Sequence, residues 1–385
     1  MHIIHSYILD FNMKISFNYI YITNIIFIGV FFLIIITPLI LTLLNPNSST
    51  NIENKTLAQK PPVQLIREGK FGEYVKNGAK YFEDSYQLKS NLININSLID
   101  YYGFNISPKD SVTLGKDQWL FYTAEDGVNI QDYYGKKLFQ EKDLENISKE
   151  ITNIKTKLDK RNIQFIIMMT PNKHTIYEEY LPSRIRNQKG SLTRADQYTP
   201  ILSSLNVNYI DLRKTLLDQK SQYAYPLYYS LDSHWNDRAG LIAYNKLLTK
   251  INPRPSTKIP DITIGTKNRT GDLGNIIGLS HRLKDTSISA NIPSPPLYST
   301  NITNTKEINQ IITKNPNGDP RKILMFKDSF SGALLPFMSS QFSEVLYDAN
   351  PKVDFNLIDE YKPDIVILQF VERYSNILLQ NGNKF

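Results

Sequence analysis

Two segments of this 385-residue chain contain residues whose types and spacing suit proton transfer and nucleophilic attack. In the first, Asp232 and His234 stand two residues apart within YYSLDSHWNDRAG. A histidine can take up a proton near neutral pH, and it needs a partner that fixes its tautomer. Asn236 and Asp237 are good N-cap residues, so we expect the pair on a tight loop before a helix. By itself, an Asp-x-His pair is more often an ordinary surface or core contact.

The second segment is KDSFSG, which directly follows the expected strand KILMF and has Ser329 as its third residue. A serine at a turn from strand to helix holds its hydroxyl at the C-terminal edge of a sheet, where open α/β folds bind ligands. The start of the next helix offers free N–H groups to a developing oxyanion. These features favour a nucleophilic serine, and the alternative is that Asp328 or Ser329 only caps the helix.

A further polar segment, TPNKHTIY at residues 170–177, follows the apolar run IQFIIMM. It also falls at the C-terminal end of an expected strand, where it could orient a substrate, and an ordinary turn is the alternative. Placement at the sheet edge makes candidates for substrate or oxyanion contact of five residues: Asn172, Lys173, Tyr177, Arg373 and Tyr374.

The elements that must position these residues alternate between strand and helix. Strands are predicted at 163–169, 207–211, 323–326 and 365–370, and helices at 140–161, 193–204 and 237–250. Helical periodicity also covers 63–102, and 112–122 reads as a hairpin. Continuous apolar strands are typical of buried parallel sheets. The pattern therefore predicts an α/β fold, a doubly wound, mostly parallel sheet with helices on both faces.

The N-terminus predicts a membrane anchor. Residues 25–44 carry no charge, and about 20 apolar residues let a helix cross a hydrocarbon layer of ~30 Å. We interpret residues 1–45 as an uncleaved signal anchor, or transmembrane helix, and a cleaved signal peptide is the alternative. A polar linker is expected at 46–62 and one catalytic domain at 63–385. Its Pro-, Ser-, Thr- and Asn-rich part, about 253–320, predicts a loop-rich insertion.

Composition excludes several kinds of function. The formal net charge is +7, but Lys and Arg are scattered among acids, so we predict no nucleic-acid partner. The chain has no cysteine, which excludes disulfides and thiolate chemistry. The five histidines are dispersed without the spacing of metal ligands. We therefore predict neither a metal nor a cofactor.

The chain resembles the alginate O-acetyltransferase branch and related DHHW proteins of the SGNH-hydrolase-like superfamily. The matching pieces follow one another over most of the chain after residue 80. They are YFEDSYQLKSNLI (81–93), GKDQWLFY (115–122), TPNKHTIYEEYLP (170–182), DSHWNDRAG (232–240), GDLGNIIGL (271–279) and KDSFSGALLPFMSSQF (327–342). Ser233 departs from the literal DHHW spelling, while the acid and the second histidine of that motif persist as Asp232 and His234.

The resemblance implies an SGNH-like domain in circularly permuted order, with Ser329 as nucleophile, His234 as general base and Asp232 orienting the imidazole. It implies an O-acetyltransferase that moves an acetyl group through an acyl-serine intermediate onto hydroxyls of an exported or cell-envelope polysaccharide. A membrane-bound O-acyltransferase is the expected acetyl donor partner. With the anchor, this predicts a single-pass inner-membrane protein whose catalytic domain is periplasmic. The alternatives are a carbohydrate esterase with the same triad and a non-catalytic glycan-binding scaffold subunit.

Overall fold

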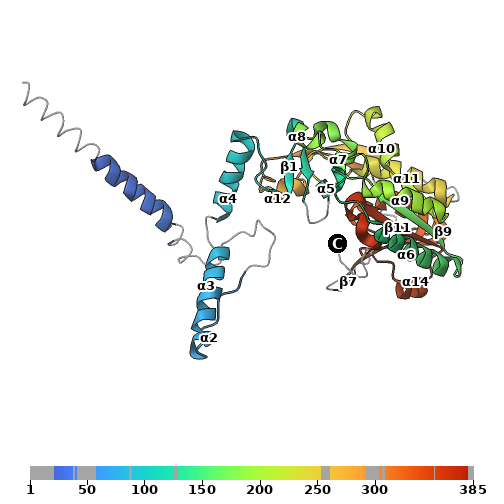
Figure 1. Ribbon diagram of the computed structural model, residues 1–385, viewed down its shortest axis with the longest axis horizontal. Coiled ribbons are helices and arrows are strands. Elements are labelled where there is room, and N and C mark those ends of the chain that lie inside the picture. The colour runs from blue at the N-terminus through green and yellow to red at the C-terminus, as the bar shows by residue number, and fades with distance from the viewer. Residues whose placement is uncertain are drawn as a thin grey trace, which may run out of the picture. The chain divides into compact units, whose positions relative to one another are not determined.

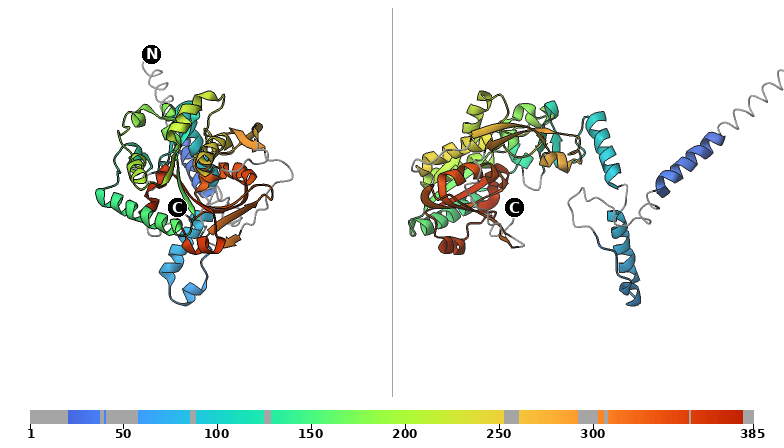
Figure 2. Two further views of the ribbon diagram at one scale, coloured as in Figure 1. Left: turned by 90° about the vertical axis from the view of Figure 1, so that its right-hand side faces the viewer. Right: turned by 180° about the vertical axis from the view of Figure 1, so that it is seen from behind.

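The computed structural model describes residues 21–37, 40, 58–85, 89–124, 129–252, 261–291, 303–305, 308–350 and 352–379. The chain divides into two compact units, Met1–Ile99 and Asp100–Phe385. Figure 1 labels their elements, and Figure 2 shows the same ribbon from two further sides.

Beyond the expected linker, the described part of the N-terminal unit is helical, as predicted for residues 63–102. The helices beyond the linker are α2 (Gln64–Arg67), α3 (Phe71–Ser85) and α4 (Lys89–Leu98), followed by a π-helical turn at Ile99–Gly103. Asp84 of α3 accepts a hydrogen bond from the backbone N–H of Ala58, 2.8 Å away. This contact holds the segment before α2 against α3.

The predicted anchor lies partly outside the described residues. Residues 21–37 are helical, whereas 1–20 and 41–45 are not described, nor are residues 46–57 of the expected linker. None of the helices in the described part of the chain combines the length and the apolar character that crossing a membrane takes.

A mixed sheet forms the centre of the C-terminal unit, and its described strands follow the order β4-β3-β11-β9-β10-β8-β7. From β4 to β10 neighbouring strands are parallel, while β8 pairs antiparallel with β10, and β7 with β8. The mostly parallel sheet is thus confirmed. The strands are β3 (Gln164–Thr170), β4 (Asn208–Asp211), β7 (Thr303–Thr305), β8 (Ile308–Lys314), β9 (Asp319–Phe326), β10 (Phe342–Asp348) and β11 (Ile365–Val371).

Both faces of the sheet are covered, because side chains alternate across each strand. In β3, Ile166 and Met168 join one apolar cluster, and Ile167 and Met169 join the other. Residues of α11 complete the first cluster and residues of α6 the second. Each fully buried side chain of this kind stabilises the fold by about 1.5–3 kcal/mol. The predicted helices on both faces are therefore confirmed.

Three helices of this unit, α6, α9 and α11, agree closely with the predicted ranges, and the other helices of its described part were not predicted by range. The described helices of the unit are α5 (Asn129–Tyr133), α6 (Glu141–Asp159), α7 (Lys173–Ile176), α8 (Ser183–Arg186), α9 (Arg194–Ser204), α10 (Arg213–Gln219), α11 (Asp237–Ile251), α12 (Asp272–Ile276), α13 (Leu335–Gln341) and α14 (Phe355–Tyr361). The predicted hairpin is present as the antiparallel pair β1 (Val112–Leu114) and β2 (Leu120–Tyr122).

The region expected to be loop-rich, about 253–320, instead carries strands in its described part. β5 (Asp261–Arg269) pairs antiparallel with β6 (Asp285–Asn291), and β7 and β8 extend the main sheet. In β6 only Ile288 is buried. Antiparallel strands with one solvated face need few apolar residues, so a polar composition does not identify them as strands.

Candidate active site

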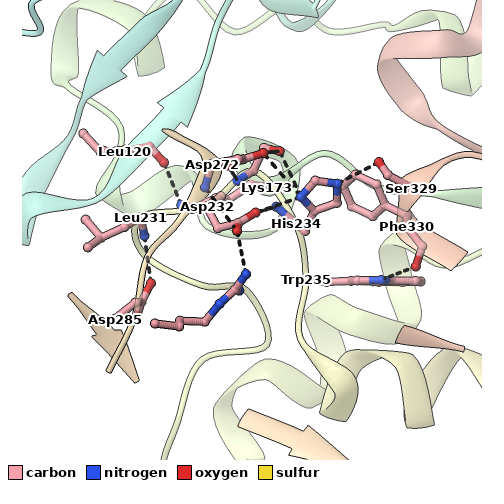
Figure 3. A network of polar contacts seen from close by, with 12 residues as sticks. Leu120, Lys173, Leu231, Asp232, His234, Trp235, Asp272, Asp285, Ser329 and Phe330 are labelled. Carbon is pink, nitrogen blue, oxygen red and sulfur yellow. Dashed lines mark hydrogen bonds and ion pairs between the residues drawn. The ribbon is translucent and has the colours of Figure 1, made fainter. Parts of the chain in front are cut away.

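The side chains of Ser329, His234 and Asp232 form one line of hydrogen bonds (Figure 3). His234 Nε2 lies 2.7 Å from Ser329 Oγ, and His234 Nδ1 lies 2.7 Å from Asp232 Oδ1. Asp232 Oδ1 also accepts the backbone N–H of His234 at 2.9 Å, which closes the tight loop expected from the Asp-x-His spacing. Folding thus brings the serine next to a histidine that lies 95 positions earlier in the chain.

Residues around His234 hold its loop against the serine turn. Tyr228 and Trp235 form an isolated antiparallel bridge on either side of the loop. Asn236 caps α11, as predicted, because its side chain accepts the N–H groups of the first helical turn. The indole Nε1 of Trp235 donates to the carbonyl oxygen of Phe330 at 2.8 Å. This bond ties the histidine loop directly to the residue after the serine.

Ser329 begins a short 3₁₀ helix, η5 (Ser329–Ala333), after the end of β9. Asp328 is the cap, since its carboxylate accepts the N–H of Phe330 at 2.9 Å. The same carboxylate accepts the N–H of Val371 at 2.6 Å and the side-chain amide of Gln369 at 2.8 Å. Asp328 therefore joins the ends of β9 and β11. The hydroxyl of Ser329 does not cap the helix and is hydrogen-bonded to His234.

Gly240 lets α11 pack directly on η5. A Cβ atom built at this position would overlap the carbonyl oxygen of Ala333. Overpacking of this kind costs about 1–3 kcal/mol, so Gly240→Ala should lower the free energy of unfolding by that amount. Urea unfolding followed by circular dichroism measures it. Gly332→Ala is the control, because its Cβ would meet no atom within 4 Å. Equal midpoints for the two variants would contradict the close packing.

The carboxylates around His234 change its protonation. Burial alone would lower the pKa of His234, but hydrogen bonds to Asp232 and Asp272 and their negative charges raise it to about 9. Burial would raise the pKa of Asp232, but its contacts with His234 and with Arg269, 2.9 Å away, hold it below the usual range. The resting site therefore favours an imidazolium beside an ionised Asp232.

Two residues near His234 were not among the sequence-based candidates. Arg269, the last residue of β5, donates to Asp232 Oδ2, and Asp272, the first residue of α12, accepts hydrogen bonds from Ser233. Asp272 belongs to GDLGNIIGL, one of the segments that carry the family resemblance, but the sequence alone gave its residues no role. Gly271 allows this approach, because a Cβ there would overlap the carbonyl oxygen of Leu231.

Lys173 supports the backbone of the loop that carries Asp232 and His234. Its Nζ donates to the carbonyl oxygens of Leu120, Ser230 and Asp232 at 2.6, 2.7 and 3.0 Å. All three protons of an ammonium are thereby used. Burial lowers the pKa of Lys173 to about 7. The structure therefore places this candidate between the β1–β2 hairpin and the loop, where it supports the backbone.

The other candidates divide into two groups. Tyr177 is buried in the apolar core, and its hydroxyl accepts the N–H of Leu227 at 2.7 Å. The guanidinium of Arg373 lies 5.2 Å from the ring centre of Phe330 and donates to Asn172 Oδ1 at 3.4 Å. Tyr374 lies beside Arg373, with 5.1 Å between the guanidinium and the ring centre. Asn172 and Arg373 are thus grouped near the serine turn.

One group of potential metal-binding atoms and one large cavity also occur among the described residues. Ligand atoms of Asp232, His234 and Asp272 lie within 4.8 Å of one another. Their carboxylates already accept protein hydrogen bonds, and Arg269 supplies a positive charge. We therefore do not assign the group as a metal site. A cavity of about 1070 Å³ lies along the β1–β2 hairpin, and its lining includes none of these residues.

A family model described as "SGNH hydrolase-like domain, acetyltransferase AlgX" matches residues 112–306, just over half of the chain. The matched stretch contains Asp232 and His234 and ends before Ser329. The chain is 21% identical over 330 residues to the probable alginate O-acetylase AlgJ of Pseudomonas fluorescens, covering 79% of this chain and 78% of that protein.

Two solved structures are similar in fold. Bacillus cereus PatB1 with a sulfonyl adduct has a TM-score of 0.50 and 16% identity, over 70% of this chain and 97% of that one. The O-acetyltransferase domain of Pseudomonas putida AlgJ has a TM-score of 0.46 and 18% identity, over 71% and 94%. The likeness to PatB1 supports the same α/β architecture.

Proposed function

Because this chain belongs to the family of SGNH hydrolase-like domains described as acetyltransferase AlgX, we propose that it is a polysaccharide O-acetyltransferase with Ser329 as its nucleophile. The observation that carries the proposal is the continuous contact from Ser329 Oγ to His234 Nε2 and from Nδ1 to Asp232, each step 2.7 Å long. Hydrogen-bond reach between nucleophile, base and orienting acid is the geometry that acyl transfer requires.

In the proposed first step, neutral His234 removes the proton of Ser329 while Oγ attacks the acetyl carbonyl of the donor. Asp232 accepts the Nδ1–H and stabilises the imidazolium that forms. The tetrahedral intermediate collapses to acyl-Ser329, and the imidazolium returns the proton to the leaving oxygen of the donor. Asn172 and Arg373 remain our candidates for binding the oxyanion, because both are near the serine turn.

In the second step, a sugar hydroxyl takes the place of the donor. His234 removes its proton, the sugar oxygen attacks acyl-Ser329, and the proton returns to Ser329 Oγ as the acetyl ester leaves. Holding the acceptor in place while water is excluded decides between transfer and hydrolysis.

The proposed acceptor is supported by a relative, and the proposed cellular setting by the N-terminal sequence. The name alginate O-acetylase supports an exported or cell-envelope polysaccharide as acceptor. We further propose a membrane-bound O-acyltransferase as acetyl donor partner, and an N-terminal inner-membrane anchor that leaves the catalytic domain in the periplasm. The uncharged residues 25–44 support the anchor.

Product analysis separates the transferase from its alternatives. Purified protein is incubated with 4-nitrophenyl acetate and a non-acetylated alginate oligosaccharide, and mass spectrometry follows the oligosaccharide. We expect a mass increase of one acetyl group per modified hydroxyl. Release of acetate without modified oligosaccharide would instead indicate a carbohydrate esterase. Neither product, with the oligosaccharide still bound, would indicate a glycan-binding scaffold.

A further inference from the structure

A second carboxylate, Asp272, approaches the same imidazole nitrogen as Asp232. Asp272 Oδ2 lies 3.4 Å from His234 Nδ1. It also accepts the hydroxyl of Ser233 at 2.5 Å, while Asp272 Oδ1 accepts the backbone N–H of Ser233 at 2.7 Å. Ser233 Oγ itself lies 3.3 Å from Nδ1. Because the hydroxyl donates to Asp272, its oxygen is free to accept from the ring nitrogen, so Ser233 connects the carboxylate to the imidazole.

Asp232 does not act on His234 with its full charge. Its Oδ1 faces the imidazole, but its Oδ2 accepts from Arg269 at 2.9 Å and from the backbone N–H of Asp272 at 3.3 Å. The guanidinium of Arg269 offsets the charge of Asp232. Asp232 therefore stabilises the imidazolium form of His234 less than an isolated carboxylate at this distance would. Asp272 restores one negative charge within hydrogen-bonding range of the ring.

The charged groups around the imidazole come from several elements. Asp232 belongs to its own loop, Arg269 to β5, Asp272 to α12 and Lys173 to α7. Arg373 and Asp328 contact Phe330, whose ring centre lies 4.9 Å from that of the imidazole. Among them, Asp232 and Asp272 are the two that contact Nδ1. Hydrogen bonds and charges from both carboxylates raise the pKa of the imidazole.

We propose that Asp272 is a positioning residue that acts through Ser233, holding the Nδ1–H tautomer of His234 and supplying the negative charge that Arg269 offsets at Asp232. This rests on the proposed function, because it gives His234 its role as base. The departure from DHHW at position 233 then has a physical meaning, since a serine hydroxyl there connects the second acid to the ring.

The test combines an NMR titration of the His234 ring with the pH dependence of 4-nitrophenyl acetate cleavage. The spectrum of His234→Gln identifies the signal among the five histidines. In Asp272→Asn we expect the pKa of His234 to fall by about one unit. The midpoint of the kcat/KM profile should move down with it, and the plateau at high pH should fall. Ser233→Ala should move both in the same direction by less.

Asp285→Asn is the matched control. Asp285 accepts from Leu231 N at 2.8 Å and from Ser230 Oγ at 3.0 Å, so it holds the same loop without contacting the ring. We expect it to leave the pKa of His234 unchanged. Asp272→Glu keeps the charge and should keep the raised pKa, which separates electrostatics from damage to the fold.

Equal pKa values of His234 in the wild type and Asp272→Asn would overturn the proposal, as would an equal shift in Asp285→Asn. The titration does not depend on catalysis. If Ser329→Ala retains full activity while Asp272→Asn still lowers the pKa of His234, the proposed function fails and the role of Asp272 stands.

Discussion

Replacing Ser329 with alanine should reduce acetyl transfer by about 10⁴-fold or more, because it removes the hydroxyl that forms the proposed acyl intermediate. His234→Ala should cost about as much, since nucleophile and base act as one unit and their losses do not add. The measurement is the rate of acetyl release from 4-nitrophenyl acetate, with and without the oligosaccharide acceptor. An acyl adduct on the tryptic peptide that contains Ser329, detected by mass spectrometry in the wild type only, would identify the nucleophile.

Ser331→Ala is the control within the same turn. Its hydroxyl donates to the carbonyl oxygen of Asp328 at 3.0 Å and does not face His234. We expect this variant to retain most of the activity. A Ser329→Ala variant that stays folded and active would refute the assignment of the nucleophile, whatever the distances around it.

The activity should rise steeply with pH across the neutral range. The pKa of His234 is raised to about 9, so below that pH most of the imidazole is protonated and cannot act as a base. The neutral fraction grows about tenfold per pH unit, which predicts about a hundredfold gain in kcat/KM between pH 6 and 8. Steady-state rates corrected for hydroxide-catalysed hydrolysis would show this slope.

The direction of this pH dependence tests whether the carboxylates near His234 stabilise its protonated form. Because the pKa of folded His234 lies above the ordinary value, the imidazole keeps its proton up to a higher pH. The activity must therefore increase as the pH rises toward 9. If the activity no longer changes with pH above 7, the carboxylates do not stabilise the protonated form of His234. Asp232→Asn should remove the main hydrogen-bond acceptor of Nδ1 and move the rise to lower pH.

Among the described parallel strands, β3, β4, β9 and β11 could be predicted, and β3 and β11 are the clearest in the sequence. IQFIIMM and IVILQFV are continuous apolar runs, which buried parallel strands require on both faces. β10, with the sequence FSEVLYD, and β8, with INQIITK, alternate with polar residues and were not predicted. Residues far away in the sequence decide which strands pair with β8 and β10, and the composition of a strand does not contain this information.

Predictions about the site were limited by side-chain direction. Turn chemistry placed Ser329, Lys173 and Asn172 at the sheet edge, but position at an edge does not say which way a side chain points. Lys173 turns toward Leu120, 53 positions earlier, because three carbonyl oxygens are available there. Arg269 and Asp272 were not anticipated, since they belong to the region that composition assigned to loops, although the segment GDLGNIIGL contains Asp272.

The strand order has a consequence for biosynthesis. β11 lies between β3 and β9, although it is the last of the described strands along the chain. Until residues 365–371 have been synthesised, the half of the sheet with β3 and the half with β9 have no shared partner. Val371 and Gln369 also complete the hydrogen bonds of Asp328 beside the serine. A chain that has not yet formed β11 therefore lacks the partners that hold Asp328 and the turn of Ser329, the proposed nucleophile, and we expect it to be unreactive.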